Sequence, residues 1–317
     1  MATSTGVVDA IAEENLGVYR ASPIRLREDV SQEAQIASDY RGRLVYELLQ
    51  NADDAMTGTA TEDDRIVVRL TDTDLWVGNS GRLLDEADVK GLCGLGASRK
   101  EEIVGRRRAS IGHKGMGFKS VLEITTAPEV FSEDYAFRMA ADVAREPIED
   151  LMAELGHRKP GRVPVMRFPS TLTTLPDYWE ELHRSGIRTL FRFPLRADLT
   201  DDQRSLLAER LLALPVTTIL FLKHLERVEI SVETKQRHES FFWQIRRNRW
   251  TGAEWKSCIG LTETGTYQVR VEAADESHDF LLVHDADVEI GDHRGGLDTY
   301  AWEGIEVSEV SVAALLE

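Results

Sequence analysis

The chain has 317 residues, of which 42% are hydrophobic, so it can bury the core of one large or two ordinary domains. Its formal net charge of −17 opposes non-specific attraction to nucleic acid and to anionic membranes, since both are polyanions. The two cysteines, Cys93 and Cys258, are far apart and form no CxxC motif, which argues against a disulfide framework. The lack of a signal-like N-terminus and of long apolar runs predicts a soluble protein of the cytoplasm.

Two helices are predicted near the start of the chain. The first covers residues 7–16, and the second covers residues 31–56 with Ser31 as its N-cap. The apolar residues of the second helix recur at helical spacing: Val45, Leu48, Leu49, Ala52 and Met56. One side of this helix is therefore expected to be buried.

Polar residues occupy a neighbouring face of the same helix. Glu47, Asn51 and Asp54 are spaced i, i+4 and i+7, which places them within roughly 60° of arc. Asn and Asp are poor residues for a helix interior because their side chains compete for backbone hydrogen bonds. A solvated polar face would explain them. So would a site in which the amide oxygen of Asn51 holds Mg²⁺ beside a nucleotide triphosphate and Glu47 faces a water molecule.

The middle of the chain alternates strands, helices and loops. Strands are predicted at residues 65–70 and 74–79, and a helix is predicted to begin near Asp85. Residues 91–117 are rich in glycine and basic residues, and residues 141–187 form an insertion or a long connection.

The C-terminal part is rich in strands. A strand at residues 188–195 precedes a helix at residues 200–214, for which Thr200 is the N-cap. Further strands are predicted at residues 227–232, 239–245, 266–273, 279–284 and 309–316. Helices and strands mix without strict βαβ alternation, so we predict an α+β sandwich and not a doubly wound parallel sheet.

The segment IGHKGMGFKS, residues 111–120, places three glycines before an expected helix: Gly112, Gly115 and Gly117. Glycines let the backbone approach a ligand closely and turn its N–H groups toward phosphate oxygens. Lys114 and Lys119 add positive charge. A Walker A loop is excluded, because Phe118 separates the last glycine from Lys119. The spacing alone is weak evidence, since GLCGLG at residues 91–96 satisfies it as well.

Five motifs, in a fixed order, resemble those of the GHKL superfamily of ATPases, which includes gyrase, the ninety-kilodalton heat-shock chaperones, histidine kinases and MutL. They are ELLQNADDA, WVGNSGRLL, GLGASRK, IGHKGMGFKS and GIRTLFRFPL, and the resemblance covers residues 30–230. The segments QNADDA and GHKGMGFKSV are most similar to sequences of the sacsin-type, chaperone-like branch. The resemblance implies a Bergerat-type fold, in which helices cover a mixed, mostly antiparallel sheet. It also implies an ATP-binding domain over residues 1–198, with a lid at about residues 91–114, followed by a transducer-like α+β region over residues 199–317.

The resemblance implies roles for individual residues. Glu47 matches the general base, Asn51 the Mg²⁺ ligand, and Asp54 the carboxylate later on the same helix. Gly81 matches the glycine beneath the adenine, and Thr189 the threonine that reaches the base through water. The lid and the phosphate-binding loop account for the other matches: Ser98, Lys100, Gly112, His113, Lys114, Gly115, Met116, Gly117, Phe118 and Lys119.

Asn79 departs from the family pattern, because it stands where the family usually has Asp. Its carbonyl oxygen can accept a hydrogen bond from adenine without charge assistance, whereas its NH₂ group could donate to the O6 atom of guanine. We expect ATP to be preferred over GTP, because sacsin-like relatives also tolerate Asn at this position. Lys223 is a candidate sensor of the terminal phosphate, although a lysine at the edge of a buried element explains it equally well.

The resemblance predicts Mg²⁺-dependent ATP hydrolysis by a module that drives conformational change in a larger chaperone-like or defence-type protein. A nucleotide-sensing module without significant turnover is the first alternative. A DNA-processing ATPase of the MutL or topoisomerase type is the second, and the acidic composition opposes it. The expected partners are ATP, a protein client or further domains, and a second copy in a nucleotide-dependent homodimer.

Overall fold

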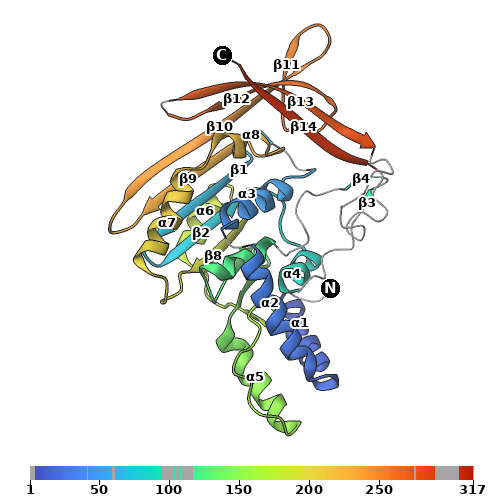
Figure 1. Ribbon diagram of the computed structural model, residues 1–317, viewed down its shortest axis with the longest axis vertical. Helices are drawn as coiled ribbons and strands as arrows, with labels where there is room; N and C mark the ends of the chain where they lie inside the picture. The colour runs from blue at the N-terminus through green and yellow to red at the C-terminus, as the bar shows by residue number, and fades with distance from the viewer. Residues whose placement is uncertain are drawn as a thin grey trace.

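The protein is built around one mixed sheet with helices packed against it (Figure 1), which confirms the predicted α+β class. The computed structural model describes residues 4–40, 42–58, 61–94, 103–104, 107–108, 117–274, 276–289 and 307–316. Within these ranges, none of the helices combines the length and the apolar character that a membrane span requires.

Three helices open the chain: α1 Ser4–Ala21, α2 Ile24–Asp39 and α3 Leu44–Ala55. The prediction of one helix over residues 31–56 is wrong, because the chain turns between α2 and α3. Gly42 has a φ of +81°, a left-handed conformation that glycine adopts easily and that ends a helix. Ser31 lies inside α2, and the residue at its N-cap position is Pro23. The break leaves α3 as a separate helix with its own packing surface.

The strands pair in the order β3-β4-β14-β13-β12-β10-β9-β1-β2-β8-β5-β6-β7, and β11 pairs with β10. Their bounds are β1 Arg65–Thr71, β2 Asp74–Asn79, β3 Ile103–Val104, β4 Arg107–Arg108, β5 Glu129–Ser132, β6 Tyr135–Met139, β7 Pro169–Thr171, β8 Thr189–Pro194, β9 Arg227–Glu233, β10 His238–Trp250, β11 Trp255–Cys258, β12 Gly265–Glu272, β13 Ser277–Glu289 and β14 Val307–Leu316. The strands predicted from alternating and β-branched sequence are therefore confirmed. β1 pairs in parallel with β9 and antiparallel with β2. Strands from both sides of the predicted boundary at residues 198–199 therefore belong to one sheet. The domain boundary itself stays a prediction.

The remaining helices are α4 Glu86–Cys93, the 3₁₀ helix η1 Gly117–Glu123, α5 Ala141–Glu154, α6 Asp177–Arg184, α7 Asp201–Leu212 and α8 Val216–Leu220. Two predicted helix starts are confirmed. Asp85 caps α4 and Thr200 caps α7, each through a reciprocal capping box. The segment 141–187 contains α5, β7 and α6.

The central strand β2 is buried on both faces. Leu75 and Val77 belong to the core that α3 covers, whereas Trp76 packs with Trp179 on the opposite face, where α6 lies. Side chains alternate between the faces of a strand, so Asn79 lies on the same face as Leu75 and Val77. The end of β2 thereby presents a polar side chain to the side of the sheet that α3 occupies.

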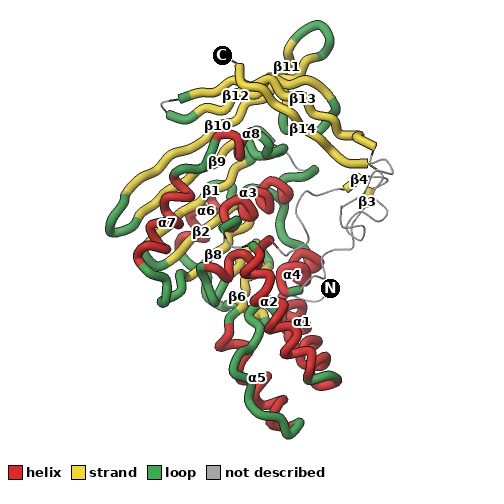
Figure 2. The backbone as a smooth tube through the Cα atoms, in the orientation of Figure 1, coloured by secondary structure: helices red, strands yellow, loops and turns green. Residues whose placement is uncertain are grey.

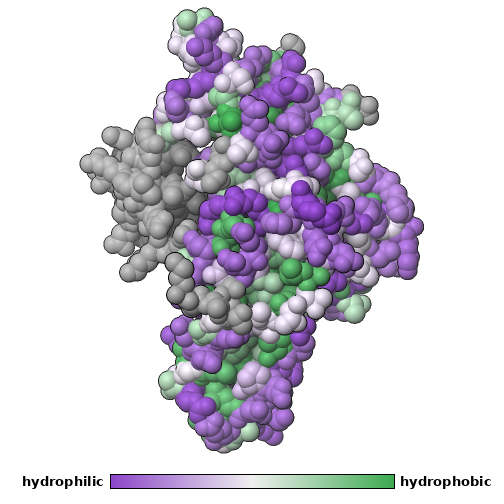
Figure 3. Space-filling view, turned by 180° about the vertical axis from the view of Figure 1, so that it is seen from behind, coloured by the Kyte–Doolittle hydropathy of each residue, from purple (hydrophilic) through white to green (hydrophobic). Residues whose placement is uncertain are grey.

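Strands β10, β12, β13 and β14 extend beyond the helices (Figure 2). The main core continues into them, since Ile245 and Val269 belong to the same cluster as Ile230 of β9. On the outer face of this extension, Val283 and Val312 pair across β13 and β14 and are exposed. The view from behind shows a mostly hydrophilic surface with apolar side chains in small groups (Figure 3).

Candidate functional site

Helix α3 carries the three polar residues that the sequence predicts to bind a nucleotide. Only 6% of the surface of Glu47 is exposed, and Asn51 and Asp54 are half-buried. Leu48 and Leu49 pack in the main core and fix the rotation of the helix. The three polar side chains therefore lie on one helix, beside its buried stripe.

The carboxylate of Glu47 lies against the start of η1. A Cβ atom added at Gly117 would overlap Glu47 Oε2, so the main chain can approach the carboxylate this closely only because the residue is glycine. The Nε atom of Arg43 lies 3.6 Å from Glu47 Oε1. Burial raises the pKa of Glu47, and the positive charge of Arg43 partly offsets that effect. A buried carboxylate with a raised pKa is well suited to accept a proton.

The C-terminal end of α3 meets the turn that follows β2. A Cβ atom at Gly81 would lie 2.6 Å from the carbonyl oxygen of Ala55, so only glycine fits there. The N–H group of Arg82 donates to the same carbonyl at 2.8 Å and so satisfies one of the free carbonyls at the helix end. Gly81 is therefore required for the close packing of the turn against the helix.

Asn79 and Thr189 stand opposite each other in β2 and β8. Both are buried, and directly opposed side chains share one face of a sheet. The hydroxyl of Thr189 lies 2.9 Å from Ser132 Oγ, and Asn79 Oδ1 accepts a hydrogen bond from the Gly81 N–H at 3.1 Å. The structure thus brings together the residues predicted to bind the base.

The structure describes only the last part of the predicted phosphate-binding loop. The side chain of Phe118 is in the core, with its ring 5.4 Å from that of Phe191, so only its main chain could meet a ligand. The other residues predicted in the lid and the loop lie outside the described residues: Ser98, Lys100, Gly112, His113, Lys114, Gly115 and Met116. Their roles stay predictions.

Lys119 is fully buried in η1. Burial lowers its pKa to about 8, while the nearby Cys93 and Glu33 act in the opposite direction. The carboxylate of Glu33 on α2 accepts N–H bonds from Val165 and Met166 at 2.8 Å each, which fixes the connection before β7 to the helices. The groups that influence Lys119 are therefore those of a structural cluster, and its predicted contact with phosphate stays a prediction.

No role was predicted for Asp53, which the structure places at a junction between α3 and the segment before β9. Its carboxylate is buried and accepts the backbone N–H groups of Lys223, His224 and Leu225, each at 2.8 Å. A signal was present in the sequence, since Asp53 follows Leu49 by four residues and so lies on the apolar stripe of the helix. A carboxylate on that stripe must find hydrogen-bond donors when it is buried.

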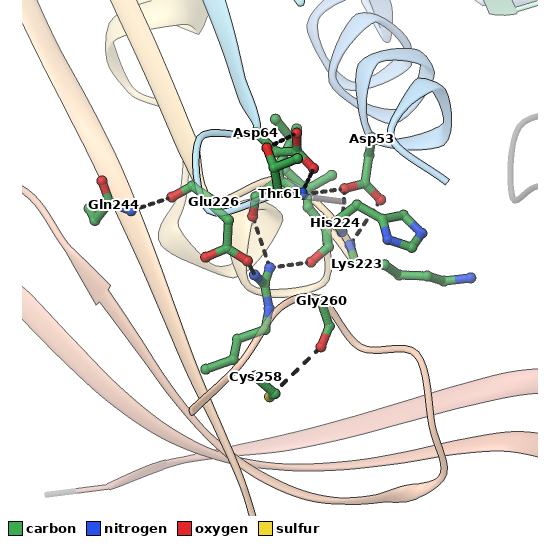
Figure 4. Close-up of polar contacts among 12 residues, drawn as sticks. Asp53, Thr61, Asp64, Lys223, His224, Glu226, Gln244, Cys258 and Gly260 are labelled. Atoms are coloured by element: carbon green, nitrogen blue, oxygen red, sulfur yellow. Dashed lines mark hydrogen bonds and ion pairs between the residues drawn. The ribbon is translucent and has the colours of Figure 1, made fainter. Parts of the chain in front are cut away.

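A buried ion pair lies on the other side of the segment that Asp53 holds (Figure 4). Arg247 on β10 contacts Glu226 at 2.7 Å and donates to the carbonyl oxygens of Leu222 and Leu225. Burial raises the pKa of Glu226 to about 7, although Arg247 lowers it. Figure 4 shows the side chain of Lys223 extending away from this pair.

Two of the cavities among the described residues bear on the predicted site. One, of about 360 Å³, lies beside Leu70, Arg204 and Lys235, at the opposite end of β1 from the strand end that pairs with Asn79. The other, of about 80 Å³, lies between α3 and α8 and is lined in part by Asp53 and Asp54. Neither cavity encloses enough space at the predicted site to hold a nucleotide. The loop predicted to complete that site lies outside the described residues.

A cluster of three or more His, Cys, Asp or Glu side chains able to hold a metal ion does not occur within the described ranges. The Mg²⁺ site predicted at Asn51 is of another kind, because it uses one amide oxygen together with phosphate oxygens and water.

The fold and the site define an α+β protein in which one helix, α3, packs closely against Gly81 and Gly117, and in which Asn79 and Thr189 form a buried polar pair on the sheet. The chain belongs to the family described as the Sacsin domain, whose model matches residues 30–242. It is also similar to Protein NO VEIN of Arabidopsis thaliana, with 29% identity over 161 residues. That match covers 51% of this chain and only 5% of the plant protein.

Proposed function

We propose that this chain is a Mg²⁺-dependent ATPase module of the GHKL type. The observation that carries the proposal is the arrangement around α3, where Glu47 meets the backbone of Gly117. At the end of the same helix, Gly81 packs against its last turn, beside the buried pair of Asn79 and Thr189. These contacts join four separate segments of the chain. The segments carry the residues to which the resemblance gives the roles of general base, phosphate binding and nucleobase binding.

The residues present fit a magnesium nucleotide. Half-buried Asn51 offers one amide oxygen to Mg²⁺, and the backbone at Gly117 approaches without a side chain in the way. Bound Mg²⁺ would neutralise charge on the phosphates during phosphoryl transfer. Asp54, one turn after Asn51, adds a second oxygen-bearing group on the same face.

Glu47 acts as the general base in this proposal. Its carboxylate orients the attacking water and accepts its proton, and Gly117 fixes the distance between that carboxylate and the phosphate-binding backbone. Positioning and charge neutralisation supply most of the catalysis of phosphoryl transfer, so the fixed geometry matters more than the strength of the base.

The module serves, in our proposal, as part of a larger chaperone-like or defence-type protein in the cytoplasm. In this proposal nucleotide binding closes the lid and rearranges or dimerises the N-terminal region, and hydrolysis resets it. The membership in the Sacsin domain family and the small share of NO VEIN that the chain matches are consistent with a module within a long protein. A protein client or a second copy would then respond to the nucleotide state.

Three substitutions on α3 test the proposal. Glu47→Ala is expected to bind Mg·ATP as the parent does but to release phosphate at least about 100-fold more slowly, since removal of a general base has that effect. Asn51→Ala and Asp54→Ala are expected to lose binding itself. Calorimetric titration and a phosphate-release assay measure the two quantities. A Glu47→Ala protein that turns over at the parental rate would exclude Glu47 as the base, and a parent that binds without turnover would identify a sensing module.

GTP is a second candidate ligand because of one hydrogen bond. The Oδ1 atom of Asn79 accepts the Gly81 N–H, which leaves the NH₂ group as the other polar end of the side chain, and an NH₂ group can donate to guanine O6. ATP remains our proposal, and competition in which GTP displaces bound ATP more effectively than ATP itself would replace it.

A further inference from the structure

The larger of the two cavities lies at the end of the sheet opposite the predicted nucleotide site. Helix α7 forms one wall, and the turns that join β1 to β2 and β9 to β10 form further walls. Its volume of about 360 Å³ lies within the range of pockets that bind small molecules. Leu70 at the cavity is four residues along β1 from Ile66, which pairs with Asn79. About 13 Å of strand therefore separates the cavity from the predicted base site.

The inner part of the cavity is apolar. Leu70 of β1 and Leu207 and Ala208 of α7 line it, and all three are buried members of the main core. Ser205, three residues before Ala208 on the same helix, is half-buried and also lines the cavity. The cavity thus reaches the core, and an apolar group that entered it would be removed from water.

Two cationic side chains line the same cavity, and neither forms an ion pair with a described residue. The guanidinium of Arg204 donates to the carbonyl oxygens of Asp72 at 2.9 Å and Arg196 at 3.1 Å. These bonds use two of its five N–H groups and fix the guanidinium in place. The main-chain N–H of Lys235 donates to the Asp72 carboxylate at 3.1 Å, which fixes the β9–β10 turn that carries the second cation. The cavity therefore has a positively charged side whose position is set by hydrogen bonds.

The other charged residues of the lining leave this side positive. Arg237 is a third cation, and the carboxylate of Glu209 lies 3.5 Å from it. The two acids are Asp72, whose carboxylate accepts a main-chain N–H, and Asp201, which is exposed in the first turn of α7. Three cations against two acids, in a chain with a net charge of −17, indicate a local attraction for an anion.

We propose that this cavity binds a small organic anion, with its phosphate or carboxylate group against Arg204 and Lys235 and its apolar body against Leu70 and Leu207. The apolar interior favours an organic compound over a bare inorganic ion, and the cationic side favours an acid over a neutral compound. Arginine suits such an acid because its remaining N–H groups can donate to two oxygens of one phosphate or carboxylate. The site is separate from the nucleotide site and does not depend on the proposed ATPase function.

Three probes test the two halves of the cavity: phenyl phosphate, inorganic phosphate and benzyl alcohol. In calorimetric titrations of the full chain, phenyl phosphate is expected to bind at least about 10-fold more tightly than either of the others, because only phenyl phosphate has both an apolar ring and an anionic group. Saturating Mg·ATP is expected to leave that affinity unchanged. Equal affinities for the three probes, or displacement of phenyl phosphate by Mg·ATP, would overturn the proposal.

Substitutions locate the bound probe. Ser205→Leu fills the cavity from α7, and leucine is a good helix former, so the fold is expected to be kept. This variant is expected to bind phenyl phosphate no more tightly than inorganic phosphate. Arg204→Gln is expected to lower the affinity for phenyl phosphate about 10-fold, and Arg204→Lys to lower it less, because lysine keeps the charge without the planar fork.

Lys256→Gln is the matched control, because that side chain is 63% exposed on β11, away from the cavity lining. It is expected to bind phenyl phosphate as the parent does. Should Arg204→Gln fail to fold in urea denaturation, Lys235→Gln removes an exposed cation of the same cavity and is expected to lower the affinity about 3-fold. Parental affinity in both Ser205→Leu and the folded cation variant would place the probe elsewhere and overturn the proposal.

Discussion

Individual side chains of this protein are explained by what surrounds them in the fold. Glu47 illustrates this, since its helix position was predictable from the motif but its burial against Gly117 was not. Its pKa is set by two opposing influences, burial and the neighbouring charge of Arg43. The pH at which Glu47 can act as a base therefore depends on a residue outside the motif.

We predict that Arg43→Ala moves the acidic limb of the kcat profile to higher pH. Arg43 lowers the pKa of Glu47, so its removal lets that pKa rise further above its ordinary value. Glu47 accepts a proton only when it is ionised, so turnover is lost as the pH falls through the raised pKa. The measurement is kcat against pH, with Arg25→Ala, an exposed arginine on α2, as the control. An unmoved limb would mean that Glu47 is not the titrating base.

Secondary-structure elements determine which motif residues meet. The strands were predictable because their alternation of apolar residues is local, and so were the capped starts of α4 and α7. The break between α2 and α3 was not predicted, because both helices have helical periodicity and only the conformation of Gly42 separates them. No local sequence pattern predicts the contact of α3 with η1, because it joins segments about seventy residues apart along the chain. Only the family resemblance implied that both segments belong to one site.

The contact between α3 and η1 predicts that Gly117→Ala lowers both stability and turnover. The added methyl group would displace the carboxylate of Glu47 or the backbone of η1, with a cost of about 1–3 kcal/mol in the free energy of unfolding and a loss of kcat. Urea denaturation and phosphate release measure the two effects. Gly17→Ala in α1, where a Cβ meets nothing within 4 Å, is the control and is expected to be neutral or stabilising. Parental turnover in Gly117→Ala would show that the contact with Glu47 has no role in catalysis.

The whole molecule is held together by a core and a polar junction that connect α3 to the strand-rich region. The core was predictable as a set of apolar residues, whereas the partners of Asp53 and Arg247 were not, because each contact links residues that are distant in sequence. Asp53 and Asp54 are adjacent in NADDA, and only their positions on the helix distinguish them. Asp53 lies on the buried face and Asp54 on the polar face. Long-range pairing of buried charges is the part of this fold that local sequence patterns do not specify.

Arg247→Met tests the junction. It leaves Glu226 buried without its partner and the carbonyls of Leu222 and Leu225 without donors, so we predict a loss of about 3–5 kcal/mol in the free energy of unfolding. Arg246→Ala is the neighbouring control, since that side chain is 69% exposed and its ion pair should contribute less than about 1 kcal/mol. Urea denaturation at neutral pH measures both. Equal, small losses would show that the buried pair does not stabilise the junction.

The location of a bound nucleotide tests the central claim most directly. A structure of the protein with Mg²⁺ and a non-hydrolysable ATP analogue is predicted to show the metal at Asn51, the base between Gly81 and the pair of Asn79 and Thr189, and the terminal phosphate between Glu47 and the backbone at Gly117. Ligand found elsewhere, such as beside Arg204 and Lys235, or an Asn51 side chain turned into solvent in the complex, would contradict the account.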